Sequence, residues 1–337
     1  MSVVTALPAT AHALLAPSKG LLAADESFPT IGKRFDALAI PSNEETRRAY
    51  REMLFTAPDL NEFISGVILF DETIRQNIGG RSIPETLVGQ GIIPGIKVDL
   101  GAIELPGFEG EKITQGLDGL RERLVEYRKL GARFTKWRAV IALNAQLPNP
   151  ACLSANAQAL ALFASFSQEA GLVPIVEPEV LMDGEHTLER CEQVTGETLT
   201  RVFDALAEHR VALDGMLLKT GLVLSGKDCP QPAGIEAVAE ATLRCLRRHV
   251  PAAVAGIVFL SGGQGDVGAT ARLNAICQPG GSPWPLTFSY GRALQDAAMK
   301  TWAGSPANVP AAQAALLHRA RCNSLAVLGK YSATAEA

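Results

Sequence analysis

The chain has 337 residues, of which 47% are hydrophobic and 20% are charged, a balance that indicates a globular protein with a large core. A formal net charge of −4 argues against nucleic acid or an anionic membrane as a partner, because the chain has no general basic field. Six cysteines without a CxxC pair and five histidines without ligand spacing indicate reduced thiols, and we expect neither a metal nor a cofactor.

Neither a targeting segment nor a membrane span is predicted. No Lys or Arg precedes Lys19, so the sequence shows neither the basic region of a signal peptide nor an Arg-rich transit pattern. No apolar run approaches the roughly 18 residues that a membrane span needs. We therefore expect a cytoplasmic protein.

Eight short apolar runs bounded by turn residues are predicted to be strands. They begin, in chain order, at Gly20, Ile64, Ile92, Arg133, Val173, Gly215, Ala255 and Pro285. Their apolar residues are continuous rather than alternating, as in parallel strands that are covered on both faces. Amphipathic helices are predicted between them, over residues 43–56, 115–130, 154–170, 188–209 and 235–250.

Strands that alternate with helices over about 270 residues predict an α/β fold, a single (β/α)8 TIM barrel with N- and C-terminal extensions. No linker or low-complexity segment divides the chain. We therefore treat residues 1–337 as one barrel domain, with 1–17 as an N-terminal extension and 332–337 as a short tail.

Polar residues gather where the predicted strands end. They are Asp25 and Glu26, Asp71 and Glu72, Lys97 and Asp99, Lys136 and Arg138, Glu177 and Glu179, Lys219, residues 261–263, and residues 290–292. Active sites of TIM barrels form at the C-terminal ends of the strands. We therefore expect these groups to converge on one rim.

Lys219 lies in the otherwise apolar run GMLLKTGLV. It either ends a strand and reaches solvent through its stem, or it is a buried amine that its surroundings keep neutral for attack on a carbonyl. Lys136 and Arg138 are two residues apart and share one strand face. Glu177 and Glu179 have the same spacing on the next strand. Two cations and two carboxylates beside Lys219 favour a Schiff-base enzyme, because a carboxylate can move the protons of imine formation.

Glycine-rich loops follow the seventh and eighth predicted strands, as LSGGQG at 260–265 and SYGRAL at 289–294. Loops at these places in a barrel often bind phosphate through backbone N–H groups and a helix N-terminus. Their glycines permit close backbone approach, and Arg292 can add a charge-assisted hydrogen bond. Other rim cations could hold a second phosphate: Arg34, Lys97 and Arg138.

Together these motifs resemble the class I fructose-1,6-bisphosphate aldolases, the metal-independent Schiff-base family. The resemblance covers nearly the whole chain and rests on SKGLLAADES, SGVILFDET, GIKVD, KWRAV, GLVPIVEPEVL, LLK, FLSGGQ, LTFSYGRALQ and NSLAVLGKY. It implies reversible cleavage of fructose 1,6-bisphosphate to dihydroxyacetone phosphate and glyceraldehyde 3-phosphate, in glycolysis and gluconeogenesis. It also implies a homo-oligomer, commonly a tetramer.

The resemblance further implies residue roles. Lys219 forms the Schiff base, Glu177 is the main general acid/base, and Asp25 assists in deprotonating the hydroxyl whose collapse breaks the C3–C4 bond. Lys136 and Glu179 tune the charge around these groups. One phosphate would lie near Ser27, Arg34, Arg47, Lys97 and Arg138, and the other near Ser261, Gly262, Gly263, Ser289, Gly291 and Arg292.

The chain departs from the family at three places. Thr220 and Gly221 follow Lys219, where the family usually has Pro and Asn in the motif LLKPN. The chain also reads ADESFPT where ADESTGS is usual. It ends six residues after Tyr331, without the longer tail whose terminal tyrosine helps proton exchange in the animal enzymes, so we expect slower protonation of the enamine or another proton donor.

Two alternatives stay open at this point. The rim changes leave room for fructose 1-phosphate, sedoheptulose bisphosphate or another ketose phosphate as the substrate. A non-catalytic barrel that only binds a partner is the other alternative, and the intact catalytic set argues against it.

Overall fold

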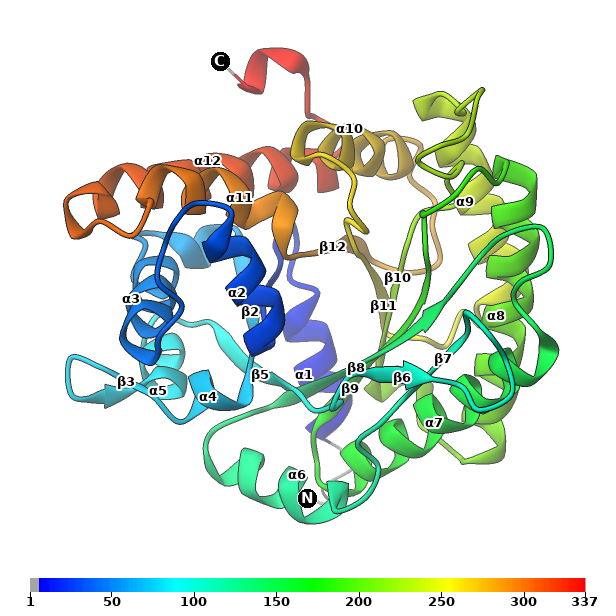
Figure 1. Cartoon of the computed structure of the whole chain (residues 1–337), viewed down its shortest axis with the longest axis horizontal. Coiled ribbons are helices and arrows are strands. Elements are labelled where there is room, and N and C mark those ends of the chain that lie inside the picture. The colour runs from blue at the N-terminus through cyan, green and yellow to red at the C-terminus, as the bar shows by residue number, and fades with distance from the viewer. Residues whose placement is uncertain (1–5, 337) are drawn as a thin grey trace.

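The computed structural model describes residues 6–336, and its centre is a closed barrel of eight parallel strands. Around the ring the order is β1–β12–β11–β10–β9–β8–β5–β2. Their bounds are β1 (Gly20–Ala24), β2 (Ile64–Leu69), β5 (Ile93–Lys97), β8 (Phe134–Ile141), β9 (Val173–Val180), β10 (Leu217–Thr220), β11 (Gly256–Phe259) and β12 (Leu286–Tyr290). Each falls within a predicted strand region. Helices surround them, so the predicted (β/α)8 barrel is confirmed (Figure 1).

The outer layer contains all five predicted helices and several more. Its members are α2 (Phe28–Asp36), α3 (Glu44–Phe55), α4 (Asp71–Ile74), α5 (Ile83–Gly89), α6 (Leu120–Lys129), α7 (Pro150–Glu169), α8 (Leu188–Glu208), α9 (Ile235–His249), α10 (Asp266–Cys277), α11 (Arg292–Trp302) and α12 (Val309–Val327). Two small hairpins are also present, β3 (Asn77–Ile78) with β4 (Arg81–Ser82), and β6 (Ala102–Glu104) with β7 (Lys112–Thr114).

Two predicted helix starts were wrong. The helix predicted from residue 115 begins at Leu120, because Gly116 and Gly119 take positive φ values of 123° and 64° that a helix does not contain. The helix predicted from residue 154 begins at Pro150, where Asn149 accepts a hydrogen bond from the N–H of Ala151 and caps the first turn.

A short helix, α1 (Leu7–Leu14), closes the N-terminal end of the barrel. Its buried residues are Leu7, Ala11 and Leu14. They recur at three- and four-residue spacing, so they share one face of the helix. That face packs into an apolar cluster inside the barrel together with Phe134 of β8. The predicted extension at 1–17 therefore contains a helix that completes the barrel core.

The second, larger core lies between the strands and the outer helices. Trp137 of β8 faces this layer and stacks on Phe163 of α7, with ring centroids 5.6 Å apart. Side chains alternate along a strand, so Lys136 and Arg138 on either side of Trp137 face the barrel interior. The apolar layer thus fixes the direction of both cations.

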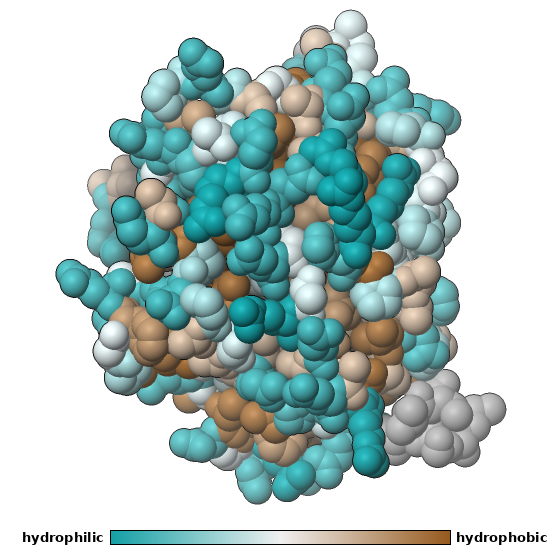
Figure 2. Space-filling model, turned by 90° about the vertical axis from the view of Figure 1, so that its right-hand side faces the viewer, coloured by the Kyte–Doolittle hydropathy of each residue, from teal (hydrophilic) through white to brown (hydrophobic). Residues whose placement is uncertain are grey.

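On the side where α8 and α9 lie, the molecule is largely hydrophilic with small scattered apolar areas (Figure 2). Arg247 and Arg248, near the end of α9, are exposed. None of the helices between residues 6 and 336 combines the length and apolar character that a membrane crossing requires.

Candidate active site

A cavity of about 810 Å³ opens at the C-terminal ends of the barrel strands. Its walls come from residues at or just after the ends of all eight barrel strands and from α2 and α11. All but two of the sequence-predicted site residues line it: Asp25, Ser27, Arg34, Lys97, Lys136, Arg138, Glu177, Glu179, Lys219, Ser261, Gly262, Ser289, Gly291 and Arg292. The rim therefore brings together residues that are up to 267 positions apart, from Asp25 to Arg292.

Lys219 is the third residue of β10 and is 4% exposed. Its ammonium does not extend to bulk solvent, so the solvent-reaching interpretation was wrong. Instead Nζ forms an ion pair with Oε1 of Glu177, at 3.0 Å. A buried amine held against a buried carboxylate at the floor of a cavity is suited to proton exchange between the two groups.

Lys136 connects this pair to a second carboxylate. Its Nζ lies 2.7 Å from Oδ2 of Asp25 and 3.3 Å from Oε2 of Glu177. The four side chains thus alternate in charge, in the order Asp25, Lys136, Glu177 and Lys219. Each buried charge has an opposite partner, which offsets the cost of removing it from water.

The protonation states of this chain follow from its geometry. Burial alone would raise the pKa of Asp25, but the charges of Lys136 and Lys219 outweigh burial and lower it to about 2. For Glu177, burial also favours the neutral form, and the charges of Lys136, Lys219 and Arg138 again lower the pKa below its usual value. Burial works against the charge of Lys136, yet Asp25 and Glu177 raise its pKa. Both carboxylates are therefore ionised and Lys136 stays a cation at neutral pH.

Glu177 has an oxygen available for a ligand. Its Oε2 is buried and, within residues 6–336, accepts no hydrogen bond. The ion pair with Lys136 neutralises its charge but leaves this hydrogen-bonding capacity unused. An oxygen atom of a bound substrate can satisfy it.

Two further ion pairs lie higher on the rim. Arg138 pairs with Glu179 across the β8–β9 boundary, and Nζ of Lys97 lies 2.7 Å from Oδ1 of Asp99. The Arg138 side chain is 43% exposed, whereas those of Glu179 and Asp99 are buried. These acidic partners hold the two cations at the cavity wall, where the cationic groups can still contact a ligand.

The loops after β11 and β12 present unpaired donors. Gly263 has a φ of 92°, and a Cβ atom there would lie 3.3 Å from a terminal nitrogen of Arg292. Glycine therefore gives Arg292 room, although Gly263 itself does not line the cavity. Within residues 6–336 no carboxylate oxygen lies within 4.0 Å of the Arg292 guanidinium nitrogens, and the buried Ser289 hydroxyl has no hydrogen-bond partner. Gly291 directly precedes α11, so this corner suits an anion.

Arg34 of α2 is held by acceptors that follow β1 and that belong to α11. It forms ion pairs with Glu26 and, at 2.9 Å, with Asp296 of α11. Tyr50 and Gln295 complete the network through a hydrogen bond of 2.8 Å. This fixes the guanidinium at the cavity wall.

Arg47 and the acidic pair after β2 lie outside the cavity. Both oxygens of Glu72 accept hydrogen bonds from Arg47, at 2.8 and 2.6 Å, and Asp71 binds Arg75 and Tyr127. Asp71 and Glu72 begin α4 instead of extending β2, so the chain carries them toward the outer helices. The expectation that every polar group at a strand end reaches the rim was wrong for this pair.

The structure also adds residues that the sequence analysis did not select. Lys33 and Pro29 of α2, Phe70 after β2, and Leu100 and Ala102 near β6 all line the cavity. A start signal for α2 was present, because Ser27 precedes Phe28 and Pro29, and proline favours the first turn of a helix. Leu100 and Ala102 have no comparable signal, since they depend on the position of the β6–β7 hairpin.

Comparison with known proteins identifies the family. The family model described as fructose-bisphosphate aldolase class-I matches residues 6–337. The chain is 55% identical to a probable fructose-bisphosphate aldolase class 1 of Xanthomonas axonopodis pv. citri, over 96% of this chain and 98% of that protein. It is 52% identical to a fructose-bisphosphate aldolase of Dictyostelium discoideum, over 97% and 92% of the two chains.

A solved structure shares the whole fold. It is the fructose-bisphosphate aldolase of Plasmodium falciparum in complex with TRAP and a small-molecule inhibitor, with a TM-score of 0.97 and 47% identity over 98% of this chain and 96% of that one. A barrel with a buried amine and carboxylate at its strand ends, matched along its length by this family, leads to one conclusion. The chain belongs to the class-I fructose-bisphosphate aldolase family.

Proposed function

We propose that the chain cleaves fructose 1,6-bisphosphate reversibly to dihydroxyacetone phosphate and glyceraldehyde 3-phosphate through a Schiff base on Lys219. One observation carries the assignment of the nucleophile. Lys219 Nζ lies 3.0 Å from Glu177 Oε1, and both side chains are buried at the floor of the cavity. This pair supplies both the amine and the group that can take its proton.

Imine formation begins with transfer of a proton from Lys219 to Glu177. The neutral amine then attacks the ketone carbon, the carbonyl π electrons move to oxygen, and a proton passes from the nitrogen, now positively charged, to that oxygen to give a neutral carbinolamine. A second proton lets this oxygen leave as water while the nitrogen lone pair forms the C=N bond. Loss of the Lys219 charge removes one interaction that lowers the pKa of Glu177, so the carboxyl can hold and deliver protons.

Cleavage requires a base near the C4 hydroxyl and a place for the released electrons. Asp25 is ionised, with a pKa of about 2, and assists removal of the hydroxyl proton with Glu177. The oxygen electrons form the aldehyde C=O, the C3–C4 bond breaks, and its pair forms the enamine as the iminium nitrogen becomes neutral. Protonation at C3 and hydrolysis of the imine then regenerate Lys219. Lys136 and Glu179 set the charge around these steps.

The cation distribution supports a bisphosphate as the substrate. One anion site consists of Ser289, Gly291 and Arg292 with the backbone at residues 261–263, and a second set of residues lines the cavity from α2, β5, β8 and the end of β1. That second set is Ser27, Lys33, Arg34, Lys97 and Arg138. A ketose monophosphate would leave one of these sets without an anion, so fructose 1,6-bisphosphate is favoured over fructose 1-phosphate.

Trapping of the imine tests the proposal. Borohydride reduction in the presence of dihydroxyacetone phosphate, followed by peptide mass mapping, should place a covalent adduct on Lys219. The Lys219→Met variant should give no adduct and no cleavage, because methionine has no amine to form the C–N bond. An adduct at another lysine, or none in a folded protein that binds the ligand, would favour a binding protein instead.

We also propose that the chain is a cytoplasmic homo-oligomer, a tetramer, that acts in glycolysis and gluconeogenesis. The family resemblance supports this assignment. The same proposal keeps residues 1–337 as one domain, with 1–17 as an extension and 332–337 as a short tail. Sedimentation velocity tests the assembly, and a monomer across the measured concentrations would contradict it.

A further inference from the structure

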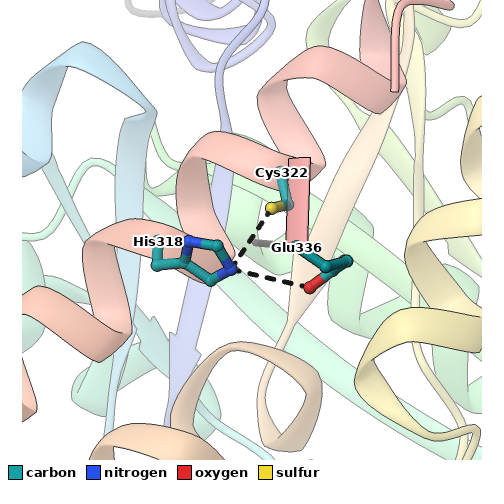
Figure 3. A group of neighbouring side chains, drawn as sticks. All are labelled: His318, Cys322 and Glu336. Atoms are coloured by element: carbon teal, nitrogen blue, oxygen red, sulfur yellow. Dashed lines mark hydrogen bonds and ion pairs between the residues drawn. The ribbon is translucent and has the colours of Figure 1, made fainter. Parts of the chain in front are cut away.

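A group of three side chains near the end of the described chain lies outside the active site. His318 and Cys322 are four residues apart on α12, so they share one face of the helix. Glu336 reaches the same point from the short 3-10 helix Ala333–Glu336. Figure 3 shows the imidazole nitrogen, the thiol and the carboxylate turned toward one another. Among residues 6–336 it is the one group of three or more His, Cys, Asp or Glu residues whose ligand atoms all lie within 4.8 Å of one another.

The distances in this group agree with a shared ion. Nε2 of His318 lies 3.8 Å from Sγ of Cys322 and 3.5 Å from Oε2 of Glu336. Ligands at typical zinc bond lengths in a tetrahedral arrangement are separated by roughly 3.4 Å for N and O, and about 3.6 Å for N and S. The His318 nitrogen therefore lies within a few tenths of an ångström of the spacing that a shared ion requires from each of the other two ligands, and those two lie within 4.8 Å of one another.

We propose that His318, Cys322 and Glu336 bind a divalent transition-metal ion of the zinc class. Nitrogen, thiolate and carboxylate are ligands that zinc accepts, and a water molecule can fill a fourth position. Binding transfers the thiol proton to solvent, so the ion is bound by one thiolate and by the carboxylate that also pairs with Arg319. The hydrogen bond from the Cys322 thiol to the carbonyl of Ala335, at 3.4 Å, is given up when the sulfur binds metal.

Neighbouring groups orient the carboxylate for this role. The Tyr331 hydroxyl donates to Oε1 of Glu336 at 2.6 Å, and Arg319 donates to Oε2. A carboxylate offers about four lone-pair positions, so these two donors leave room for a metal. Arg319 is itself fixed by a hydrogen bond of 2.6 Å to Thr270 of α10. Such outer contacts typically hold metal ligands in place.

The site is accessible to solvent, and an ion bound there would hold the segment after Tyr331. The His318 side chain is 40% exposed and that of Glu336 23%, so an ion can enter from solvent. Two ligands belong to α12 and the third to the segment after Tyr331. A bound ion therefore fastens residues 333–336 to the outer helix layer, independently of aldol cleavage.

Cobalt(II) titration of the full chain, first stripped with a chelator, tests the site. We expect one equivalent to bind and to produce the near-ultraviolet absorption of a cobalt–thiolate bond, and zinc to displace it. Cys322→Ser should abolish this absorption, and Cys229→Ser should not. Glu336→Gln and Tyr331→Phe should each weaken zinc binding, Tyr331→Phe by about tenfold.

Hydrogen exchange supplies a second readout. At free zinc of about 100 times the dissociation constant, local opening of residues 333–336 should be suppressed about 100-fold in the parent chain, and much less in Cys322→Ser. Unchanged cobalt affinity in Cys322→Ser, or a folded parent chain without thiolate absorption, would overturn the proposal. In that case the cluster is only an ion pair and hydrogen-bond contact of the chain terminus.

Discussion

At the scale of single residues, Lys136 controls the charge of two carboxylates. Its removal in Lys136→Met takes away the strongest attraction that opposes burial at Asp25, so the pKa of Asp25 should rise from about 2, and that of Glu177 should rise too. Both groups act as bases above their pKa values, so the acidic limb of the kcat/KM profile should shift to higher pH. Loss of their ionised forms should also lower kcat by about 10²- to 10⁴-fold.

The measurement is kcat/KM against pH for the parent and two variants. Lys129→Met is the matched control, because Lys129 is exposed at the end of α6. Its profile should coincide with that of the parent. If Lys136→Met kept the acidic limb of the parent, the charge assignment at Asp25 and Glu177 would be wrong.

Arg292 offers a test of the anion site at the start of α11. Arg292→Ala should lower kcat/KM for fructose 1,6-bisphosphate by about 10- to 100-fold, the value of a hydrogen bond to a charged group. Cleavage of unphosphorylated fructose should not change, because that substrate has no anion to lose. Arg247→Ala, on the exposed face of α9, is the control. An equal loss for both substrates would mean that Arg292 acts on the fold and not on phosphate.

At the scale of elements, α1 contributes to stability at the end of the barrel opposite the active-site cavity. Leu14 is fully buried, and its side chain fills the space that the absent Cβ of Gly66 leaves on β2. Leu14→Ala should lower the free energy of unfolding by about 2 to 5 kcal/mol, through lost burial and a cavity in the core. The cavity with Lys219 lies at the other end of the strands, so kcat should not change.

Equilibrium unfolding in urea measures this effect. His12→Ala changes an exposed residue of the same helix and should alter the free energy by no more than about 0.5 kcal/mol. Equal stability of the two variants would show that α1 only lies against the barrel and does not close its core.

Elements with a strong periodic pattern were predictable from sequence, and those set by long-range contacts were not. Continuous apolar runs indicated all eight strands. Because side chains alternate along a strand, Lys136 and Arg138 face the barrel interior when Trp137 packs against the helix layer. The helix α1 was missed as a core element, since Leu7 and Leu14 have their burial only against Phe134 and other distant residues.

The candidate-site residues also divide into those that were predictable from sequence and those that depend on long-range contacts. Lys219, Glu177 and Asp25 stand at strand ends, so topology alone brings them together. Arg47 and Glu72 could not be excluded from sequence, because their mutual pairing depends on the direction of α4. The meeting of His318 and Cys322 with Glu336 was equally invisible, since it requires the chain to turn back after Tyr331.

At the scale of the whole molecule, the net charge and the local charge have opposite signs. The chain carries −4 overall, yet its cavity presents Lys33, Arg34, Lys97, Arg138 and Arg292 to a substrate with two phosphates. The cavity is also lined by carboxylates, but its cations are in excess; a cleft with an excess of one charge concentrates an oppositely charged ligand, and dissolved salt screens this attraction. The surface as a whole therefore repels the substrate weakly while the cavity attracts it.

Ionic strength should separate binding from chemistry. When it rises from about 0.01 M to about 0.15 M, the screening length falls from about 30 Å to about 8 Å. We expect KM for fructose 1,6-bisphosphate to rise, because the rim cations attract the phosphates less. We expect kcat to stay constant, because the pairs among Asp25, Lys136, Glu177 and Lys219 are buried at contact distance and are screened little. Steady-state kinetics at the two salt concentrations, with unphosphorylated fructose as the uncharged control, provides the measurement. A KM that is independent of salt, or one that rises equally for fructose, would show that the rim cations are neutralised by Glu26, Asp99 and Glu179 and do not recognise phosphate.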